Sequence, residues 1–442
     1  MEIILVSIFV LGYLAITLEH TLKIDKLIPA LAMMAILWAI IALNHMPVFE
    51  VDTSLKQLVP THIDEILLHH LGKTAEIIIF LLGAMTIVEI IDYFNGFSTI
   101  KSFIKTKSKK ALLWIFAILA FILSAIIDNL TATIVLITIL QKVIGDRDTR
   151  LWFAGLIIIS ANVGGAWSPI GDVTTTMLWI ANKVTTLKLI SYLFIPSVVC
   201  VVVPVFVASL LPAFKGNIKE NHTEDEEVIH KYGSTMLYLG LAAIVFVPVF
   251  KTITHLPPYV GMMFSLAVVS TFAEIFSATK INITSIDEDS DAASHHSPVH
   301  KSLSKIELPS ILFFLGILLA VAALESLGML FGFAETLNTA IPNTDIVIML
   351  LGIGSAVIDN VPLVAASIGM FSEPMDNPLW HFIAFSAGTG GSMLIIGSAA
   401  GVVAMGMEKI DFFWYFKNIS WLAFLGFISG SITFMLLRSF IV

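Results

Sequence analysis

The sequence predicts an all-α polytopic membrane protein, built from an inverted-topology repeat with two re-entrant hairpins, two discontinuous helices and about 10 spanning helices. The first ground is composition, because 57% of the 442 residues are hydrophobic and only 13% are charged. A soluble domain carries about 25% charged residues, so a soluble protein is excluded. The second ground is a motif that occurs twice, and the third is an uneven distribution of Lys and Arg along the chain.

The repeated motif places an Asp-Asn pair in the middle of an apolar run. The first copy reads SAIIDNLTAT at 124–133, and the second reads SAVIDNVP at 355–362. A charge inside the membrane is costly unless it has a partner or a function. Because Asp128 and Asp359 recur in the same context, we interpret them as equivalent positions of an internal repeat with a shared site between its halves.

Apolar runs of roughly 20 residues predict the spanning helices. These runs lie at 1–19, 27–45, 76–94, 151–182, 189–211, 235–250, 258–276, 309–328, 379–407 and 412–437. Two further runs, 111–141 and 345–372, are each interrupted by the Asp-Asn pair. Each run is too long for one helix with a charge at its centre and too short for two full crossings. We therefore predict two re-entrant hairpins with Asp-Asn at the tip.

A second pair of matching segments predicts the discontinuous helices. SANVGG at 160–165 matches SAGTGG at 386–391, and the two continue into Gly171 and Gly397. Gly and Pro inside a spanning segment free backbone polar groups, which is tolerated only where protein or a water-lined cavity satisfies them. The runs 151–182 and 379–407 are therefore predicted to be broken helices, with each break facing a hairpin tip.

Lys and Arg in short loops mark the cytoplasmic side of a membrane protein. Five Lys residues between 101 and 110 place the mouth of the first hairpin in the cytoplasm, and Arg147 and Arg150 agree. The segments 329–345 and 373–378, which flank the second hairpin, contain no Lys or Arg. The two repeats are therefore predicted to have opposite orientations, with both chain termini outside.

These predictions divide the chain into four parts. They are N-terminal scaffold helices with an outer amphipathic segment at 1–75, a first repeat at 76–214, cytoplasmic loops with two linking helices at 215–308, and a second, inverted repeat at 309–442. The first apolar run has no preceding Lys or Arg and no cleavage signal, so we expect a retained helix. His295, His296 and His300 lie in a polar loop that we interpret as a solvated linker rather than a metal cluster.

Two hairpin tips and two helix breaks near the membrane midplane would enclose a pocket of oxygen ligands. Asp128 and Asp359 are the candidate sodium ligands, beside Asn129 and Asn360. The supporting oxygen donors are Thr131, Thr133, Ser160, Asn162, Ser386, Thr389 and Ser392. Such ligands suit a hard cation. Burial and like charge also favour protonation of one carboxylate, so the site predicts exchange of a cation for protons by competition.

Asp172 follows the first helix break and has two interpretations. It is either a third carboxylate of the site or the N-cap of the half-helix that begins after it, a role that Asp performs well. The second repeat has Ser398 at the matching position. The two interpretations are compatible, and the sequence does not choose between them.

The two Asp-Asn motifs, together with NVGGAWSPIGDVTTT at 162–176, resemble the NhaD-type sodium/proton antiporters of the ion transporter superfamily. The resemblance covers nearly the whole chain. It implies a homodimeric carrier in the bacterial cytoplasmic membrane, with a scaffold part and a transport part that moves like an elevator. The expected partners are the lipid bilayer, sodium or lithium, and protons. We expect no cofactor and no nucleic acid.

Related carriers leave other substrates open. Dicarboxylate and citrate carriers place a neutral Ser-Asn-Thr at the equivalent tip, whereas this chain has Asp128 and Asp359 at the Ser position. Two negative charges would repel a carboxylate and attract a cation. Arsenite-efflux permeases also carry an Asp-Asn motif and stay an alternative. An intramembrane aspartyl protease would need Gly-x-Gly-Asp and Tyr-Asp, which this chain lacks, so we expect no enzyme activity.

Overall fold

The computed structural model describes most of the chain. The described residues are 1–17, 23–52, 57–101, 104, 106–218, 231–278, 297–306, 308–330, 332–333, 336, 341, 343–357 and 360–441. Asp359, His295 and His296 lie outside this part, as does most of the predicted cytoplasmic loops 215–233 and 277–304. Within it, no group of three or more His, Cys, Asp or Glu could hold a metal ion.

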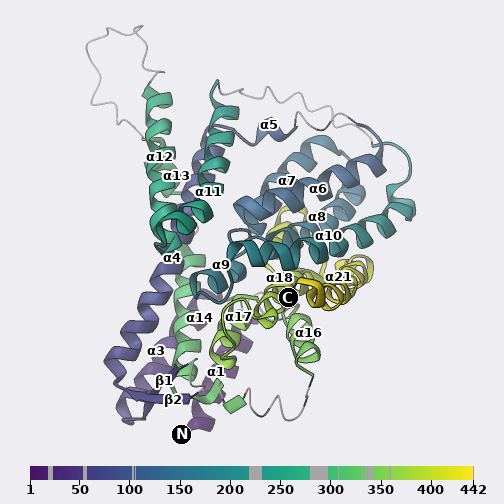
Figure 1. Ribbon diagram of the computed structural model, residues 1–442. Coiled ribbons are helices and arrows are strands. Elements are labelled where there is room, and N and C mark those ends of the chain that lie inside the picture. Colours follow the sequence, from purple (N-terminus) through teal and green to yellow (C-terminus); the bar gives the residue numbers. More distant parts are fainter. Residues whose placement is uncertain are drawn as a thin grey trace, which may run out of the picture. The chain divides into compact units, whose positions relative to one another are not determined.

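Apolar helices dominate the described part of the chain (Figure 1). Eight of them are long and apolar enough to cross a membrane: α4 Ile63–Tyr93, α6 Lys109–Ile127, α8 Arg147–Ala166, α10 Thr186–Leu210, α11 Gly233–Thr254, α12 Pro258–Ala278, α14 Leu308–Ser326 and α21 Ser420–Ile441. Six shorter apolar helices accompany them: α1 Glu2–Thr17, α3 Leu27–Leu43, α7 Asn129–Val143, α16 Thr344–Gly354, α17 Asn360–Met370 and α19 Ala399–Glu408. The predicted multi-pass helical fold is confirmed.

The predicted number of about 10 spans differs from this count for a physical reason. It includes α1 and α3, which have 16 and 17 residues. It also treats the run at 379–407 as a single span, whereas the structure divides that run into shorter helices, and it leaves out α6, which was predicted as a hairpin arm.

The chain divides into two compact units. One contains Met1–Ile78, Thr106–Asn221 and Pro309–Val442, and the other contains Ile79–Lys105 and His222–Leu308. In the second unit α11 packs against α12 and against the short helix α5 Ser98–Lys101, and α13 Pro298–Leu303 packs against α12. All the residues of the candidate site lie in the first unit.

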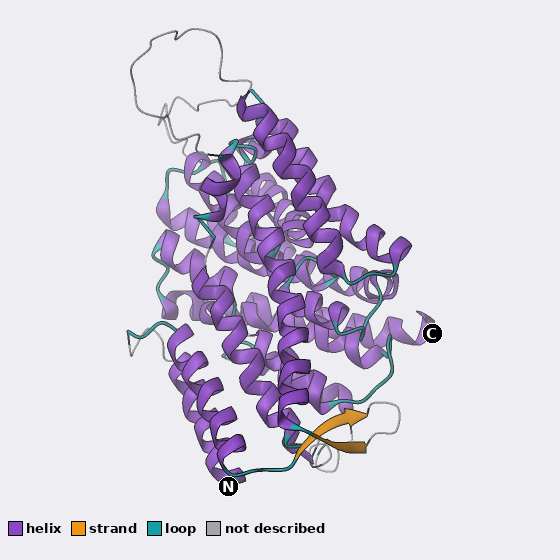
Figure 2. Cartoon of the chain, turned by 90° about the vertical axis from the view of Figure 1, so that its left-hand side faces the viewer, coloured by secondary structure: helices purple, strands orange, loops and turns teal. Residues whose placement is uncertain are grey.

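A small antiparallel sheet lies in the region predicted as an amphipathic segment (Figure 2). Strand β1 Val48–Asp52 pairs with β2 Gln57–Thr61, with Val48 opposite Thr61. Helix α4 begins two residues later, well before the predicted start of its span at residue 76. Asp64 and Glu65 lie in its first turn, where acidic side chains interact favourably with the helix dipole. Polar residues thus extend this helix instead of ending it.

The structure has a helical hairpin at the first predicted place, but its arm α6 is itself long and apolar enough to span, so the re-entrant course stays a prediction. Helices α6 and α7 contact each other and both pack against α8, with Asp128 between them as the C-cap of α6 and the N-cap of α7. At the place of the second predicted hairpin, α16 packs against α18, and α17 packs against α9 and α18. The predicted tip residue Asp359 is outside the described residues.

The two predicted discontinuous helices are also confirmed. The first consists of α8 and α9 Val173–Ile180, separated by residues 167–172, which we call the Asp172 break. The second consists of α18 Pro378–Gly390 and α19, separated by residues 391–398, which we call the Ser398 break. The Ser398 break contains two short 3-10 turns, η2 Gly391–Met393 and η3 Ile395–Gly397.

Helices α10 and α21 pack against these elements. Helix α21 packs along α10 and also against α18, and the short α20 Phe412–Asn418 packs against α21. The 3-10 turn η1 Pro212–Phe214 follows α10 and contacts α6 and α8. Helix α19 packs against both α7 and α8, and α9 packs against α17. The second half of each broken helix therefore contacts the hairpin of the other repeat. The two repeats are therefore interleaved.

Candidate functional site

Equivalent serines hydrogen-bond each hairpin to a broken helix. Ser124 Oγ in α6 donates a hydrogen bond of 2.5 Å to Ala161 O in α8. Ser355 Oγ, after α16, donates one of 3.0 Å to Ala387 O in α18. Ser124 and Ser355 occupy the same place in the repeated motif, as do Ala161 and Ala387 in the second pair of matching segments. Both copies therefore use a serine to reach the equivalent carbonyl, although Ser355 Oγ also donates to Gly352 O at 2.8 Å.

Glycines bring each break against its hairpin. A Cβ atom on Gly171 would lie 2.8 Å from Gly165 Cα and 2.8 Å from Ser124 O. A Cβ on Gly397 would likewise collide with Gly391 O and with Ala356 O. Contacts this short leave no room for any side chain. The breaks therefore need Gly for close backbone approach, and they face the hairpins as the sequence predicted.

Asp128 has an unusual backbone conformation at the tip of the first hairpin. Its φ is 85° and its ψ is 160°, a region that only Gly adopts without strain. Its Oδ1 accepts a bond of 2.7 Å from Thr131 N, and its Oδ2 accepts one of 2.9 Å from Thr131 Oγ1. The side chain is half-buried. Such strain costs about 1–3 kcal/mol and occurs most often at functional sites.

Asp172 is the buried carboxylate to which the asparagines of both hairpins donate. Its side chain is 3% exposed. Oδ1 accepts a bond of 3.3 Å from Thr174 N, so Asp172 is the N-cap of α9. Oδ2 accepts from Asn360 Nδ2 at 3.2 Å and from Asn129 Nδ2 at 3.5 Å. Asn129 and Asn360 are the first residues of α7 and α17, so one carboxylate oxygen joins the two repeats.

The Ser398 break has a neutral counterpart of this arrangement. Ser398 is the N-cap of α19, and its Oγ accepts a bond of 3.1 Å from Gly401 N. It also accepts a bond of 2.9 Å from Asn162 Nδ2 in α8. Asn162 Oδ1 in turn accepts a bond of 3.0 Å from Asn129 Nδ2. A continuous line of side-chain hydrogen bonds therefore runs from one break to the other through the asparagines.

The predicted supporting oxygens fall into two groups. The first group donates hydrogen bonds within the described structure: Thr131 Oγ1 to Asp128, Thr389 Oγ1 to Phe385 O, and Ser392 Oγ to Thr389 O. The second group has hydroxyls that are buried without a hydrogen-bond partner in the described structure, and it contains Thr133, Ser160 and Ser386. The hydroxyl of Thr174, which was not predicted as a ligand, is also buried without a partner there. Buried hydroxyls that lack a partner are costly, so each of these calls for a functional explanation.

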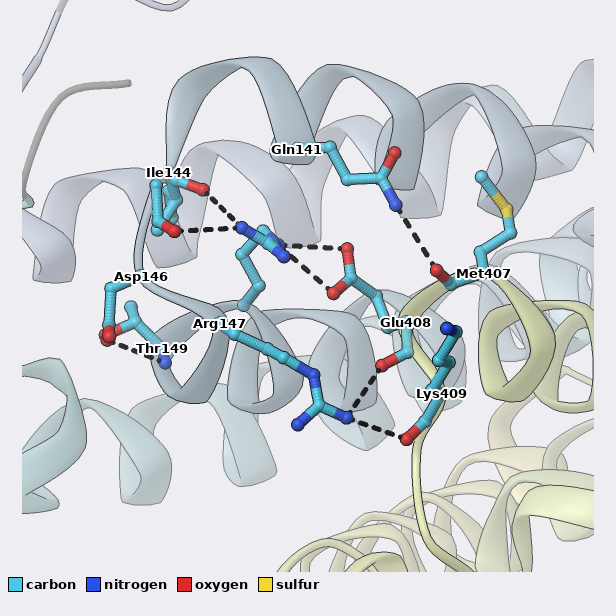
Figure 3. A network of polar contacts seen from close by, with 10 residues as sticks. Gln141, Ile144, Asp146, Arg147, Thr149, Met407, Glu408 and Lys409 are labelled. Atoms are coloured by element: carbon cyan, nitrogen blue, oxygen red, sulfur yellow. Dashed lines mark hydrogen bonds and ion pairs between the residues drawn. The ribbon is translucent and has the colours of Figure 1, made fainter. Parts of the chain in front are cut away.

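A second set of polar contacts holds the end of α19 and was not predicted (Figure 3). Arg150 Nε lies 3.1 Å from both carboxylate oxygens of Glu408, whose side chain is 1% exposed. Arg147 donates to Glu408 O and to Lys409 O. The sequence analysis used both arginines only as markers of the cytoplasmic side. The signal for this pairing was a single Glu at the end of an apolar half-helix.

A smaller set of polar contacts lies at the opposite end of the broken helices, around Asp376. Asp376, before α18, accepts bonds of 2.7 Å and 2.9 Å from Thr185 N and Thr185 Oγ1. Its own N–H donates to Lys183 O at 2.8 Å. Burial, reinforced by the nearby charge of Lys73, lowers the pKa of Lys183 in this turn. The turn after α9 is thus tied to the start of α18.

Comparisons with known proteins agree with these observations. Residues 3–382 match the model of the citrate transporter family, CitMHS. The chain is 42% identical to sodium/proton antiporter 1 of Arabidopsis thaliana, over 97% of this chain and 71% of that protein. It is 30% identical to the Na(+)/H(+) antiporter NhaD of Vibrio cholerae, over 98% of this chain and 91% of that protein.

The fold is also found among solved structures. The YdaH transporter of Alcanivorax borkumensis, whose crystal structure has an unusual topology, superposes with a TM-score of 0.55 at 13% sequence identity. The match covers 94% of this chain and 97% of that one. At this level of identity the likeness concerns the fold alone.

Proposed function

Because the chain belongs to the citrate transporter family and, within it, to the NhaD-type sodium/proton antiporters, we propose that it exchanges sodium or lithium for protons across a membrane. The observation that carries this proposal is the position of Asp172. Its carboxylate is buried, and it accepts hydrogen bonds from the first residues of both hairpin arms.

The chemistry of the site supports exchange by competition. A buried carboxylate needs a proton or a cation as its counter-charge, and the two cannot occupy the same oxygen together. The hydroxyl and amide oxygens around the breaks are hard ligands, which suit sodium better than a soft metal. We propose that protonation releases the cation and that the cation displaces the proton.

Asp128 is proposed as a second carboxylate of this site. Its strained backbone persists although Gly would relieve the strain, which supports a requirement for the side chain itself. Asp359 occupies the same place in the second motif and is proposed for the same role. Because Asp359 is outside the described residues, its part in the proposal rests on the sequence alone.

Placement in the membrane is part of the proposal. We propose a homodimer in the cytoplasmic membrane of a bacterium, with both termini outside and repeats of opposite orientation. The cluster of Lys residues between 101 and 110, which precedes the first hairpin in the sequence, supports this placement, and so do Arg147 and Arg150, which follow it.

Transport of citrate is a second candidate, because the matching family is described as a citrate transporter. A tricarboxylate would have to bind beside Asp172 and Asp128, both of which are acceptors of hydrogen bonds in the structure. Repulsion between like charges in a poorly solvated site opposes this. Cation exchange therefore fits the described residues better.

Proteoliposomes with a pH-sensitive dye inside test the proposal. Addition of sodium should move protons in the parent chain and not in Asp128→Asn. The matched control is Asp411→Asn, because Asp411 is also an N-cap that accepts from the backbone N–H three residues later, but it lies at α20. This control should transport like the parent. Uptake of labelled citrate without sodium-driven proton movement would contradict the proposal and support the second candidate.

A further inference from the structure

A second group of charged side chains lies apart from the candidate site. Glu325, next to the last residue of α14, is half-buried in a spanning helix, where an ionisable side chain is costly unless it has a function. Lys73 of α4 and Lys183 in the turn after α9 are close enough to act on its carboxylate electrostatically. We call these three residues the Glu325 cluster. Two ammonium groups beside one carboxylate repel a metal cation, so the ligand that suits this cluster is a proton.

The carboxyl group of Glu325 lies directly against the second hairpin arm. A Cβ atom on Gly369, near the end of α17, would lie 3.0 Å from Glu325 Cγ and 3.2 Å from Glu325 Oε2. These distances are shorter than ordinary van der Waals contacts. Gly369 therefore leaves the space that the glutamate side chain occupies.

Helix α4 is tied to α14 at the next residue. Ser326 Oγ donates its proton to Ala322 O at 2.7 Å. The contact of 3.2 Å between Ser326 Oγ and His70 Nε2 therefore has the imidazole as its donor. Lys73 follows His70 by three residues, so the two lie on one face of α4. The side chain of Lys73 is exposed, whereas His70 and Ser326 are buried.

Helices α9 and α17 connect this cluster to the candidate site. Asp172 is the N-cap of α9, and it accepts a hydrogen bond from Asn360, the first residue of α17. The two helices pack against each other and end near Lys183 and Gly369 respectively. With 8 and 11 residues they are about 12 Å and 17 Å long. The Glu325 cluster is therefore separate from Asp172 but shares two rigid elements with it.

Few other charges lie on the elements around α14. Helices α3 and α17 contain no titratable side chain. Strand β1 brings Glu50, which lies 3.9 Å from His69 of α4. The charges that act on Glu325 itself are those of Lys73 and Lys183. Protonation of Glu325 would thus change an environment that is set mainly by two lysines.

We propose that Glu325 is a proton-binding site, separate from the cation site, whose protonation opens a charge clamp between α14, α4 and the turn after α9. Ionised Glu325 is the shared counter-charge of both lysines. When its carboxylate takes up one proton from solution, the net charge of the cluster rises from one positive charge to two, and the lysines repel each other. Since Lys183 follows α9 closely, the constraint on the helix that Asp172 caps is then weakened. This inference rests on the proposed function, because it names a proton site that regulates that exchange.

The dependence of transport on pH tests the proposal. Initial rates of sodium-driven proton movement are measured in proteoliposomes over a series of pH values. Lys183→Gln removes one positive neighbour, so ionised Glu325 is less stabilised and the pH of half-maximal rate should rise by about one unit. Lys183→Arg keeps the charge and is the matched control, so it should keep the parent's value. In a Glu325→Gln background, Lys183→Gln should no longer move this pH.

Further variants separate a proton site from a structural role. Gly369→Ala places a methyl group against the carboxyl group of Glu325 and should also move the pH of half-maximal rate, whereas Gly406→Ala, whose Cβ meets nothing within 4 Å, should not. Glu89→Gln is the control for a carboxylate beside a lysine in a spanning helix, since Glu89 lies 3.8 Å from Lys305, and it should keep the parent's pH profile. Calorimetric titration with sodium chloride, against choline chloride as a blank, should show parent-like sodium binding by Glu325→Gln.

Specific outcomes overturn the inference. An unchanged pH profile in Lys183→Gln would do so, and so would a shift of equal size with and without Glu325. Loss of sodium binding in Glu325→Gln would also overturn it, because it would place this residue in the cation site. Each of these results, combined with sodium-driven proton movement by the parent, leaves the proposed function standing. A parent chain that moves no protons in response to sodium overturns both proposals.

Discussion

The two broken helices show how a repeated framework can carry different chemistry. Their hairpins are fastened by equivalent serines, Ser124 and Ser355, and their breaks are closed by equivalent pairs of glycines. The capping residues share one backbone conformation. The side chains at these positions, however, are Asp172 in one repeat and Ser398 in the other.

This difference distinguishes positions where the backbone packing requires a small residue from positions where the charge of the side chain differs between the repeats. Small residues recur where backbone meets backbone, because a side chain would not fit there. The residues that face the capping oxygens have diverged, with Asn162 in the first repeat and Gly388 in the second. One break therefore presents a neutral oxygen that accepts from Asn162, whereas the other presents a buried carboxylate that accepts from Asn129 and Asn360. The comparison predicts large functional effects at the acidic break and matched structural effects at the shared contacts.

The largest effect is expected from Asp172→Asn compared with Ser398→Ala. The first change keeps an N-cap but removes the buried charge, so sodium-driven proton movement should fall by at least about 100-fold, or 2.7 kcal/mol. The second change removes a neutral cap, so transport should change by less than about threefold. Initial rates in proteoliposomes, normalised to the amount of reconstituted protein, measure both. Equal losses would show that the two breaks are functionally alike.

A smaller effect distinguishes the two ends of the broken helices. Glu408→Gln leaves Arg150 without its carboxylate in a site where Glu408 is 1% exposed, and this should cost about 3 kcal/mol of stability. Asp376→Asn loses only one of the two bonds from Thr185 and should cost about 1 kcal/mol.

Denaturation midpoints in detergent rank these two variants. The control is the double variant Arg150→Met with Glu408→Met, which removes both charges and should recover part of the loss. If Glu408→Gln were no less stable than Asp376→Asn, the ion pair would not hold the end of α19.

The smallest effect tests the shared framework. Ser124→Ala removes a buried hydrogen bond to Ala161 O, and Ser355→Ala removes a hydroxyl whose proton is shared between Gly352 O and Ala387 O; each should cost about 1 kcal/mol. The two variants are each other's controls, because they occupy equivalent positions. Midpoints that differ by more than the cost of one hydrogen bond would contradict the equivalence of the two contacts.

Much of this architecture could be predicted from local patterns. An Asp-Asn pair inside an apolar run indicates a polar tip, and Gly or Pro inside a long span indicates a break. The structure has the first hairpin and both breaks at the predicted places. The sheet at 48–61 and the early start of α4 were missed, because polar residues near a span can belong to a strand, a loop or a longer helix equally well.

The partners of individual side chains were not predictable in the same way. The pairing of Arg150 with Glu408 joins residues that are 258 positions apart in the chain, and no local pattern relates them. Because Asp128 and Asp359 recur in the repeated motif, the sequence favours them over Asp172 as cation ligands. The structure instead brings the hairpin asparagines to Asp172, whose position has no acidic counterpart in the other repeat.

The sequence by itself determined that this chain is a helical membrane protein with two related halves, since hydrophobicity, helix breakers and repeated polar motifs act locally. It also shows which acidic residues lie within apolar runs. Only the tertiary structure decided that Asp172 accepts hydrogen bonds from the asparagines of both hairpins and that Asn162 donates to Ser398 at the other break. These facts depend on distances between segments far apart in the chain, and those distances arise from how the two repeats interleave.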